Sequence, residues 1–185
     1  NLVDEGAAAV WRGPMVMSAL ETLTRQADWR GTDVLVLDMP PGTGDVALSL
    51  SQTVQVAGAI VVTTPQQVAL ADSRRAVRMY QKLNIPTLGV VENMSYYSCP
   101  SCQHEADIFG RGGGEQMAAD LEVPFLGRLP IYQPIRVGSD VGIPLVVAEP
   151  DSAPTRAFFK VAELAAAQVS IAAHHAAIKN KGKIP

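Results

Sequence analysis

Two cysteines carry the most specific chemistry in this sequence. Cys99 and Cys102 stand three residues apart in a Cys-Pro-Ser-Cys run, so both thiolates can reach one metal centre or each other. The residues alone leave four interpretations open: a redox pair, part of a zinc site, half of a metal site completed by a second copy of the chain, or two idle thiols. A structural zinc site takes four ligands, and His104 would bring this set only to three. A redox pair of the thioredoxin kind lies at a helix N-terminus, whereas the flanks here read as a loop.

A turn that suits a phosphate follows an apolar run. Residues 34–37 read Val-Leu-Val-Leu, which is typical of a strand buried on both faces of a parallel sheet. Asp38 would then lie at the carboxyl end of that strand, where open α/β sheets bind their ligands. After two prolines, Gly42 and Gly44 allow backbone N–H groups to approach a ligand closely. The stretch therefore predicts a central strand that ends in a phosphate-binding turn.

Two other interpretations fit the same turn. In the first, residues 34–45 form an ordinary strand, turn and helix in which Asp45 caps the helix. Local chemistry alone favours this interpretation. In the second, the turn matches the dinucleotide fingerprint Gly-x-Gly-x-x-Ala through Gly42, Gly44 and Ala47. That match is weak because the glycine turn does not follow the strand directly, and no acidic residue ends a second strand at the required distance.

Asn93 is a further candidate binding residue. It closes the predicted strand at 87–92, and its amide carries both a donor and an acceptor, which matches the edge of an adenine. Asn is also a common turn residue, and the turn interpretation is the stronger one from the residues alone.

The elements that must position these residues alternate between strands and helices. Continuous apolar runs predict strands, and a period of 3.6 residues predicts helices. The loop 94–107 carries the cysteines, and three consecutive glycines at 112–114 indicate close backbone packing or mobility. This alternation predicts an α/β fold with a doubly wound, mostly parallel sheet and helices on both faces. The expected strands are 34–37, 59–63, 87–92 and 124–129, and the expected helices are 15–27, 45–55, 64–83, 115–121 and 153–173, with an irregular stretch at 130–142.

Composition limits the possible partners and compartments. The chain has 185 residues, 48% of them hydrophobic, with a net charge of -3 and a pI near 5.6. A negative net charge of this size does not indicate a surface that binds nucleic acid. We expect no membrane span, because no run of about 18 apolar residues occurs, and no signal peptide, because the first residues lack its basic and apolar regions. The cytoplasm is the expected location.

Four stretches give the sequence a specific resemblance to a known family. Over about residues 6–147, the chain resembles the Mrp/ApbC family of iron-sulfur cluster carriers, which are P-loop ATPases related to MinD. The residues that carry the resemblance are Asp-Met-Pro-Pro-Gly-Thr-Gly-Asp at 38–45, Trp-Arg-Gly-Pro at 11–14, Asn-Met-Ser at 93–95, and the order Tyr96, Cys99-Pro100-x-Cys102, Asp107-Ile108-Phe109 and Gly112-Gly113-Gly114.

This resemblance implies a fold, a cargo and a role for each candidate residue. In a MinD-like P-loop NTPase, Asp38 would hold Mg²⁺ through water, Gly42 would offer its N–H to the γ-phosphate of ATP, and Asn93 would contact adenine. Cys99 and Cys102 would ligate a labile [4Fe-4S] cluster shared between the two subunits of a homodimer. The protein would transfer that cluster to apo iron-sulfur proteins.

One family feature is missing from these residues. The phosphate-binding loop that ends in Gly-Lys-Ser/Thr occurs nowhere in the 185 residues, and neither does switch I. Phosphoryl transfer depends on such positioning and charge, so we expect this chain alone to be a poor ATPase. We interpret residues 1–175 as a partial P-loop ATPase domain and residues 176–185 as a basic, flexible tail. The alternatives are a non-enzymatic scaffold or adaptor, a Rossmann-type oxidoreductase and a MinD-like positioning ATPase.

Overall fold

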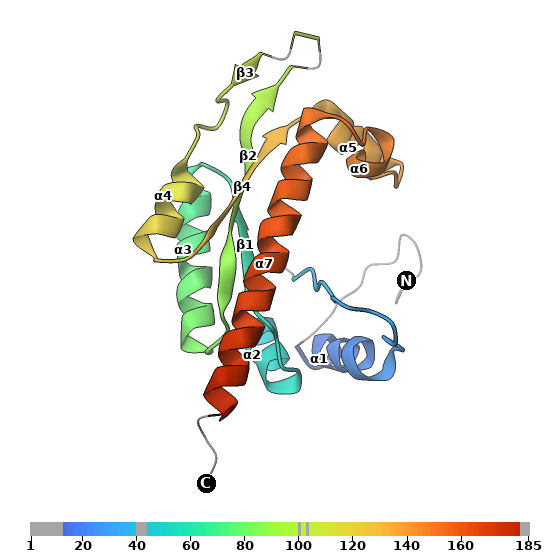
Figure 1. Cartoon of the computed structure of the whole chain (residues 1–185), viewed down its shortest axis with the longest axis vertical. Coiled ribbons are helices and arrows are strands. Elements are labelled where there is room, and N and C mark those ends of the chain that lie inside the picture. Colours follow the sequence, from blue (N-terminus) through green and yellow to red (C-terminus); the bar gives the residue numbers. More distant parts are fainter. Residues whose placement is uncertain (1–12, 40–43, 100, 103, 182–185) are drawn as a thin grey trace. The chain divides into compact units, whose positions relative to one another are not determined.

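The computed structural model describes residues 13–39, 44–99, 101–102 and 104–181, and it divides the chain into two compact units (Figure 1). The units are Asn1–Val56 and Ala57–Pro185. Asp38 therefore belongs to the first unit, and both cysteines belong to the second.

The first unit is built from helices. It contains α1 (Gly13–Glu21), a short π-helical turn η1 (Thr22–Gln26) and α2 (Gly44–Thr53), with α1 in contact with α2. The α2 residues Val46, Ala47 and Leu50 are buried, and the Arg25 guanidinium donates to the Thr53 carbonyl at 2.7 Å. The helices expected at 15–27 and 45–55 are therefore confirmed.

The strand expected at 34–37 is wrong for this structure. Residues 34–39 have no regular secondary structure, and the side chains of Val34 and Val36 are 62% and 84% exposed. A strand exists only through hydrogen bonds to a neighbouring strand, and no strand in the described part of the chain pairs with this segment. The apolar run therefore indicates only that the segment is suited to burial.

The second unit contains a parallel sheet. Its strands are β1 (Ala59–Thr63), β2 (Thr87–Ser98), β3 (Glu105–Ala106) and β4 (Phe125–Ile131). β2 lies between β1 and β4 and is parallel to both, and the short β3 pairs antiparallel with the end of β2. Apolar residues dominate β1 (Ile60, Val61, Val62) and the first half of β2 (Leu88, Val90, Val91), which is typical of a parallel sheet. Along β1, Val61 is buried, whereas Ile60 and Val62 are exposed.

Helices cover both faces of this sheet (Figure 1). On one face, α3 (Gln67–Lys82) and α4 (Gly113–Asp120) bury Val77 and Met117 against β1 and β2. On the other face, α7 (Ala153–Lys181) packs Phe158 and Val161 on Leu126 of β4. The expectation of an α/β fold with a mostly parallel sheet and helices on both faces is confirmed.

Several boundaries differ from those expected. β2 continues to Ser98 instead of ending at 92, and the stretch 130–142 contains α5 (Gln133–Asp140), with the short α6 (Leu145–Ala148) after it. α7 continues to Lys181 instead of ending near 173, because its Ala-rich second half has high helix propensity.

No described helix combines the length and the apolar character that crossing a bilayer requires. The division into a domain at 1–175 and a tail at 176–185 stays a prediction.

Candidate functional site: a cysteine hairpin at the end of strand β2

The two cysteines lie at the tip of a hairpin formed by β2 and β3. Tyr97 pairs with Ala106 and Ser98 with Glu105, and the Cys99 N–H donates to the His104 carbonyl at 3.1 Å. Cys99 is half-buried and Cys102 is exposed, and neither forms a disulfide. Because Cys99 follows a strand and leads into a turn, the pair does not have the helix N-terminal position of a thioredoxin-like redox centre.

The backbone around Cys99 favours its thiolate. The N–H of Cys102 and then that of Ser101 lower the pKa of the Cys99 thiol from its ordinary value, with smaller contributions from the Cys102 and Tyr97 side chains. Burial opposes the shift. The thiolate is the form that binds metals and attacks electrophiles, so these backbone N–H groups favour the metal-binding form of Cys99.

One hairpin supplies an incomplete ligand set. In the described part of the chain, no group of three or more His, Cys, Asp or Glu side chains could hold a metal ion. Iron-sulfur clusters of the [4Fe-4S] type take four thiolates, and structural zinc also takes four ligands. The two thiolates therefore fit a metal centre only if further ligands come from outside this hairpin.

Arg111 ties the two arms of the hairpin together, and sequence reasoning did not single it out. Its guanidinium lies 2.7 Å from the Glu105 carboxylate and 3.0 Å from that of Asp107, on the β3 side. On the β2 side it stacks over the Tyr96 ring, 4.8 Å from the ring centre. The only signal in the sequence is an Arg placed directly before the three glycines.

Glu92 is the buried charge beneath this arrangement. Its side chain is 0% exposed, and its Oε1 accepts hydrogen bonds from Ser95 Oγ (2.5 Å) and the Gly112 N–H (2.9 Å). Its Oε2 accepts the Gly114 N–H at 2.5 Å. These donors satisfy a carboxylate that burial would otherwise destabilise. The sequence indicated Glu92 only as the last residue of a strand.

The three glycines are required by this close approach. Gly112 has φ +87°, in the left-handed region that favours glycine. A Cβ on Gly113 would lie 2.7 Å from Leu70, and one on Gly114 would lie 3.1 Å from Glu92. Of the two expectations for this run, close packing or mobility, the structure shows close packing.

Asn93 lies inside β2, whereas the sequence predicted it at a strand end. It directly follows Glu92, the last β2 residue paired with β1, and so it lies at the carboxyl end of the β1–β2 ladder. Its Oδ1 accepts the Met94 N–H at 2.9 Å, and Met94 has φ +55°, so β2 is irregular here. Thr64 directly follows the last residue of β1, and its buried hydroxyl has no hydrogen-bond partner among the described residues. Ligands of parallel sheets bind at this edge.

The remaining predicted site residues lie in the first unit. Asp38 is exposed in the irregular segment, and Gly42 lies outside the described residues. The structure therefore brings Asn93, Cys99 and Cys102 onto one strand and its hairpin.

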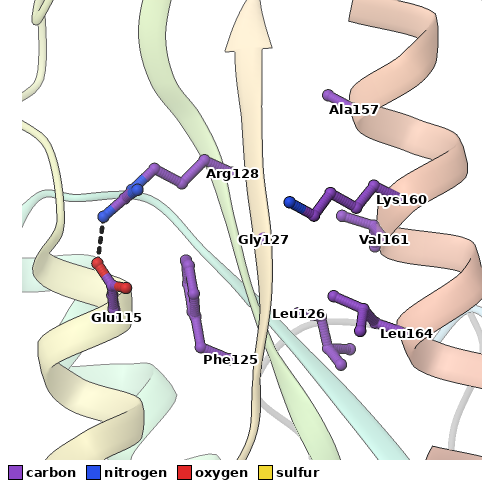
Figure 2. Close-up of a pocket in the computed structure, with 9 residues that line it drawn as sticks. All are labelled: Glu115, Phe125, Leu126, Gly127, Arg128, Ala157, Lys160, Val161 and Leu164. Carbon is purple, nitrogen blue, oxygen red and sulfur yellow. Dashed lines mark hydrogen bonds and ion pairs between the residues drawn. The ribbon is translucent and has the colours of Figure 1, made fainter. Parts of the chain in front are cut away.

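An open groove of about 370 Å³ lies elsewhere in the second unit, around β4 (Figure 2). Figure 2 shows Arg128 paired with Glu115 on the α4 side and Lys160 on the α7 side. None of the predicted site residues lines this groove.

Comparison with known proteins gives relatives that are named as iron-sulfur proteins. The chain is 48% identical over 161 residues to the iron-sulfur cluster transfer protein NUBPL of Mus musculus, covering 87% of the chain and 50% of that protein. It is 48% identical over 162 residues to an iron-sulfur protein required for NADH dehydrogenase, mitochondrial, of Arabidopsis thaliana, covering 88% and 52%. It is 47% identical over 171 residues to an iron-sulfur cluster carrier protein of Deinococcus radiodurans, covering 92% and 48%. The chain thus spans about half the length of these relatives.

Solved structures give the same fold. A nucleotide-binding protein of Archaeoglobus fulgidus in complex with ADP matches with a TM-score of 0.64 at 31% identity, over 75% of this chain and 56% of that one. MinD of Pyrococcus horikoshii, complexed with Mg-ADP, matches with a TM-score of 0.58 at 26% identity, over 82% and 56%. The expected MinD-like P-loop NTPase fold is therefore confirmed.

A family profile accounts for most of the chain. The ParA profile described as NUBPL iron-transfer P-loop NTPase matches residues 1–166. Together with the relatives above, this match confirms the resemblance to iron-sulfur cluster carriers. The chain belongs to the ParA family of NUBPL-type iron-transfer P-loop NTPases.

Proposed function

We propose that this chain is part of an ATP-dependent iron-sulfur cluster carrier that holds a labile [4Fe-4S] cluster as cargo and passes it to apo iron-sulfur proteins. The observation that carries the proposal is the hairpin tip, which presents Cys99 and Cys102 together with a backbone that favours the Cys99 thiolate. The names of the relatives as iron-sulfur transfer or carrier proteins support the same cargo.

The cluster would be shared between two copies of the chain. Each hairpin offers two thiolates, and no third ligand joins them among the described residues. A twofold axis would bring two such hairpins together and supply the four thiolates that a [4Fe-4S] cluster takes. Two ligands from each subunit on partly exposed loops would hold the cluster weakly enough for it to be handed on.

Nucleotide would bind at the carboxyl edge of the sheet. Asn93 would contact adenine there, Gly42 would donate its N–H to the γ-phosphate, and Asp38 would hold Mg²⁺ through water. ADP in the A. fulgidus protein and Mg-ADP in the P. horikoshii MinD support this part of the proposal. These 185 residues contain no Gly-Lys-Ser/Thr loop, so we expect the chain by itself to hydrolyse ATP poorly.

We propose a cytoplasmic location, although the Arabidopsis relative is named as mitochondrial.

Anaerobic cluster reconstitution tests the proposal. The protein and its Cys99→Ala variant are loaded with iron and sulfide, and iron, sulfide and the thiolate-to-iron absorption band are measured. Wild type should bind about four iron and four sulfide per dimer, and the variant far less. Ser101→Ala is the matched control, because it changes a neighbouring side chain and keeps both thiols. Full loading of Cys99→Ala would overturn the ligand assignment.

A non-enzymatic scaffold is the second candidate, favoured by the missing Gly-Lys-Ser/Thr loop. Equilibrium dialysis against labelled ATP distinguishes the scaffold from the ATP-dependent carrier. Tight, Mg²⁺-dependent binding that Asn93→Ala weakens would argue against the scaffold. Absence of ATP binding by the full-length protein would support the scaffold.

A further inference from the structure

We infer that Arg111 is a positioning residue for the cysteine hairpin, held in place by the buried carboxylate of Glu92. This inference rests on the proposed cluster-carrying function. It concerns how firmly the two thiolates are held, and not which residues are the ligands.

The hairpin needs support from outside its own strands. β3 has only two residues, and beyond its two pairs with β2 the hairpin adds the bond from the Cys99 N–H to His104. The β2 arm is also paired with β4 at Tyr96 and Tyr97, whereas the β3 arm has no strand partner other than β2 among the described residues. A two-residue strand held by one neighbour is marginally stable in water, so the β3 arm is the part that needs support. Figure 1 shows β3 beside the end of β2, with the chain running from β3 to α4.

Arg111 supplies this support because it contacts both arms. Its Nη2 pairs with Glu105 at 2.7 Å and its Nε with Asp107 at 3.0 Å, while its plane covers the Tyr96 ring. Tyr96 belongs to β2 and Glu105 to β3. A planar guanidinium can make paired ion contacts and stack on a ring at the same time, which a Lys ammonium cannot do. Releasing Arg111 would therefore free the two arms to move apart.

Glu92 fixes the backbone from which Arg111 extends. Gly112, the next residue, donates its N–H to Glu92 Oε1, and Gly114 donates to Oε2. Glu92 is fully buried in β2, so this anchor belongs to the rigid part of the sheet. Ser95 Oγ donates to the same carboxylate, which ties the anchor to the β2 segment just before Tyr96. The sheet, the glycine turn, Arg111 and the hairpin thus form one continuous series of contacts.

The prediction is a cluster that loads normally but is lost faster. Full-length protein and its Arg111→Gln variant are loaded anaerobically, and the cluster band is followed after addition of an iron chelator. We expect equal iron per dimer at the start and loss at least about tenfold faster in the variant, as for other residues that orient metal ligands. Arg111→Lys should fall between the two. Arg75→Gln, which breaks an exposed ion pair within α3, is the matched control and should leave the rate unchanged.

A second measurement needs no cluster. Amide hydrogen exchange at Cys99 reports its bond to His104, and it should accelerate in cluster-free Arg111→Gln but not in Arg75→Gln. If Arg111→Gln fails to fold, Glu105→Gln takes its place, because it removes one ion pair of Arg111 and should accelerate exchange at Cys99 in the same direction but by less. Unchanged exchange at Cys99 together with unchanged cluster loss would overturn the inference. Failure of wild type to load any cluster would overturn the proposed function, and the exchange measurement would still decide the role of Arg111.

Discussion

At the scale of single residues, the site combines a thiol whose pKa is lowered by backbone N–H groups with a buried carboxyl group that accepts hydrogen bonds from two backbone N–H groups. Cys99 is stabilised as a thiolate by the N–H groups of Cys102 and Ser101. Glu92 is satisfied by Gly112, Gly114 and Ser95, whereas Arg128 Nε, at 3.8 Å, is too far to add a hydrogen bond. Backbone N–H groups therefore contribute at both residues, and at Glu92 the Ser95 hydroxyl and the Arg128 ion pair add to them.

Alkylation of Cys99 should persist to lower pH in the folded protein than in the unfolded one. The folded pKa lies below the ordinary value of 9.0, so the thiolate is favoured between the folded pKa and 9.0. The stabilisation from this shift is complete above the unfolded pKa and is lost as the pH falls through the folded pKa. The rate of iodoacetamide labelling is measured against pH in a Cys102→Ser variant, folded and in denaturant. Coincident midpoints would contradict the role of the backbone donors.

Replacing Glu92 with Gln should destabilise the second unit. The amide keeps one acceptor oxygen but turns an NH₂ group toward a backbone N–H, so a buried donor loses its partner. Hydrogen bonds to charged groups contribute about 1.5–3 kcal/mol, and we expect a loss of that size in the free energy of unfolding in urea. Glu115→Gln, which removes an exposed partner of Arg128, should cost about 1 kcal/mol or less. Equal losses in the two variants would show that burial of Glu92 is not important.

At the scale of elements, β2 is the part that organises the site. Its first half is paired with β1, its end is paired with β3, and β4 pairs with both halves on the other side. Asn93 lies between these halves, where the β1 pairing ends and Met94 takes a positive φ. One strand therefore links the edge at which we propose that nucleotide binds to the hairpin that we propose holds the cluster.

The apolar segment 34–37 should contribute little to the stability of this chain. Val36 is 84% exposed, whereas Val46 of α2 in the same unit is 9% exposed. At about 0.8 kcal/mol for each buried CH₂, Val46→Ala should cost about 1–2 kcal/mol. Val36→Ala should stay within about 0.5 kcal/mol. Chemical denaturation of both variants measures this, and similar losses would mean that the segment is covered in solution.

At the scale of the whole molecule, the described residues contain no group of three or more metal-binding side chains, and the chain spans about half the length of its relatives. The first unit holds Asp38, and the second holds Asn93 and the cysteines. Under the proposed function, the two thiolates of one chain would need ligands from a second copy, and we therefore expect assembly and cluster binding to depend on each other.

Loading with a cluster should convert the protein to a dimer that depends on both cysteines. Sedimentation equilibrium under anaerobic conditions should show a larger dimer fraction for the loaded wild type than for the cluster-free protein. The Cys99→Ser, Cys102→Ser double variant should show no such increase, because it has no thiolates to share. A loaded wild type that sediments as a monomer would contradict a shared cluster.

The sequence by itself determined the α/β class, the approximate positions of the sheet strands at 59–63 and 124–129, and the family. These follow from local apolar periodicity and from runs of neighbouring residues such as Cys-Pro-Ser-Cys, which can be recognised without knowing what they contact. It also predicted a strand at 34–37, which is wrong here because pairing depends on a neighbouring strand and not on the apolar run alone.

Only the tertiary structure decided how the cysteines are held. Glu92 meets Gly112 across 20 residues of sequence, and Arg111 meets Tyr96 across the hairpin. Nothing in the local pattern separates a buried strand Glu from an exposed one, or an Arg that joins two strands from one that faces solvent. Such contacts between distant residues form only when β2 and the turn before α4 are packed together, so no local spacing in the chain could predict them.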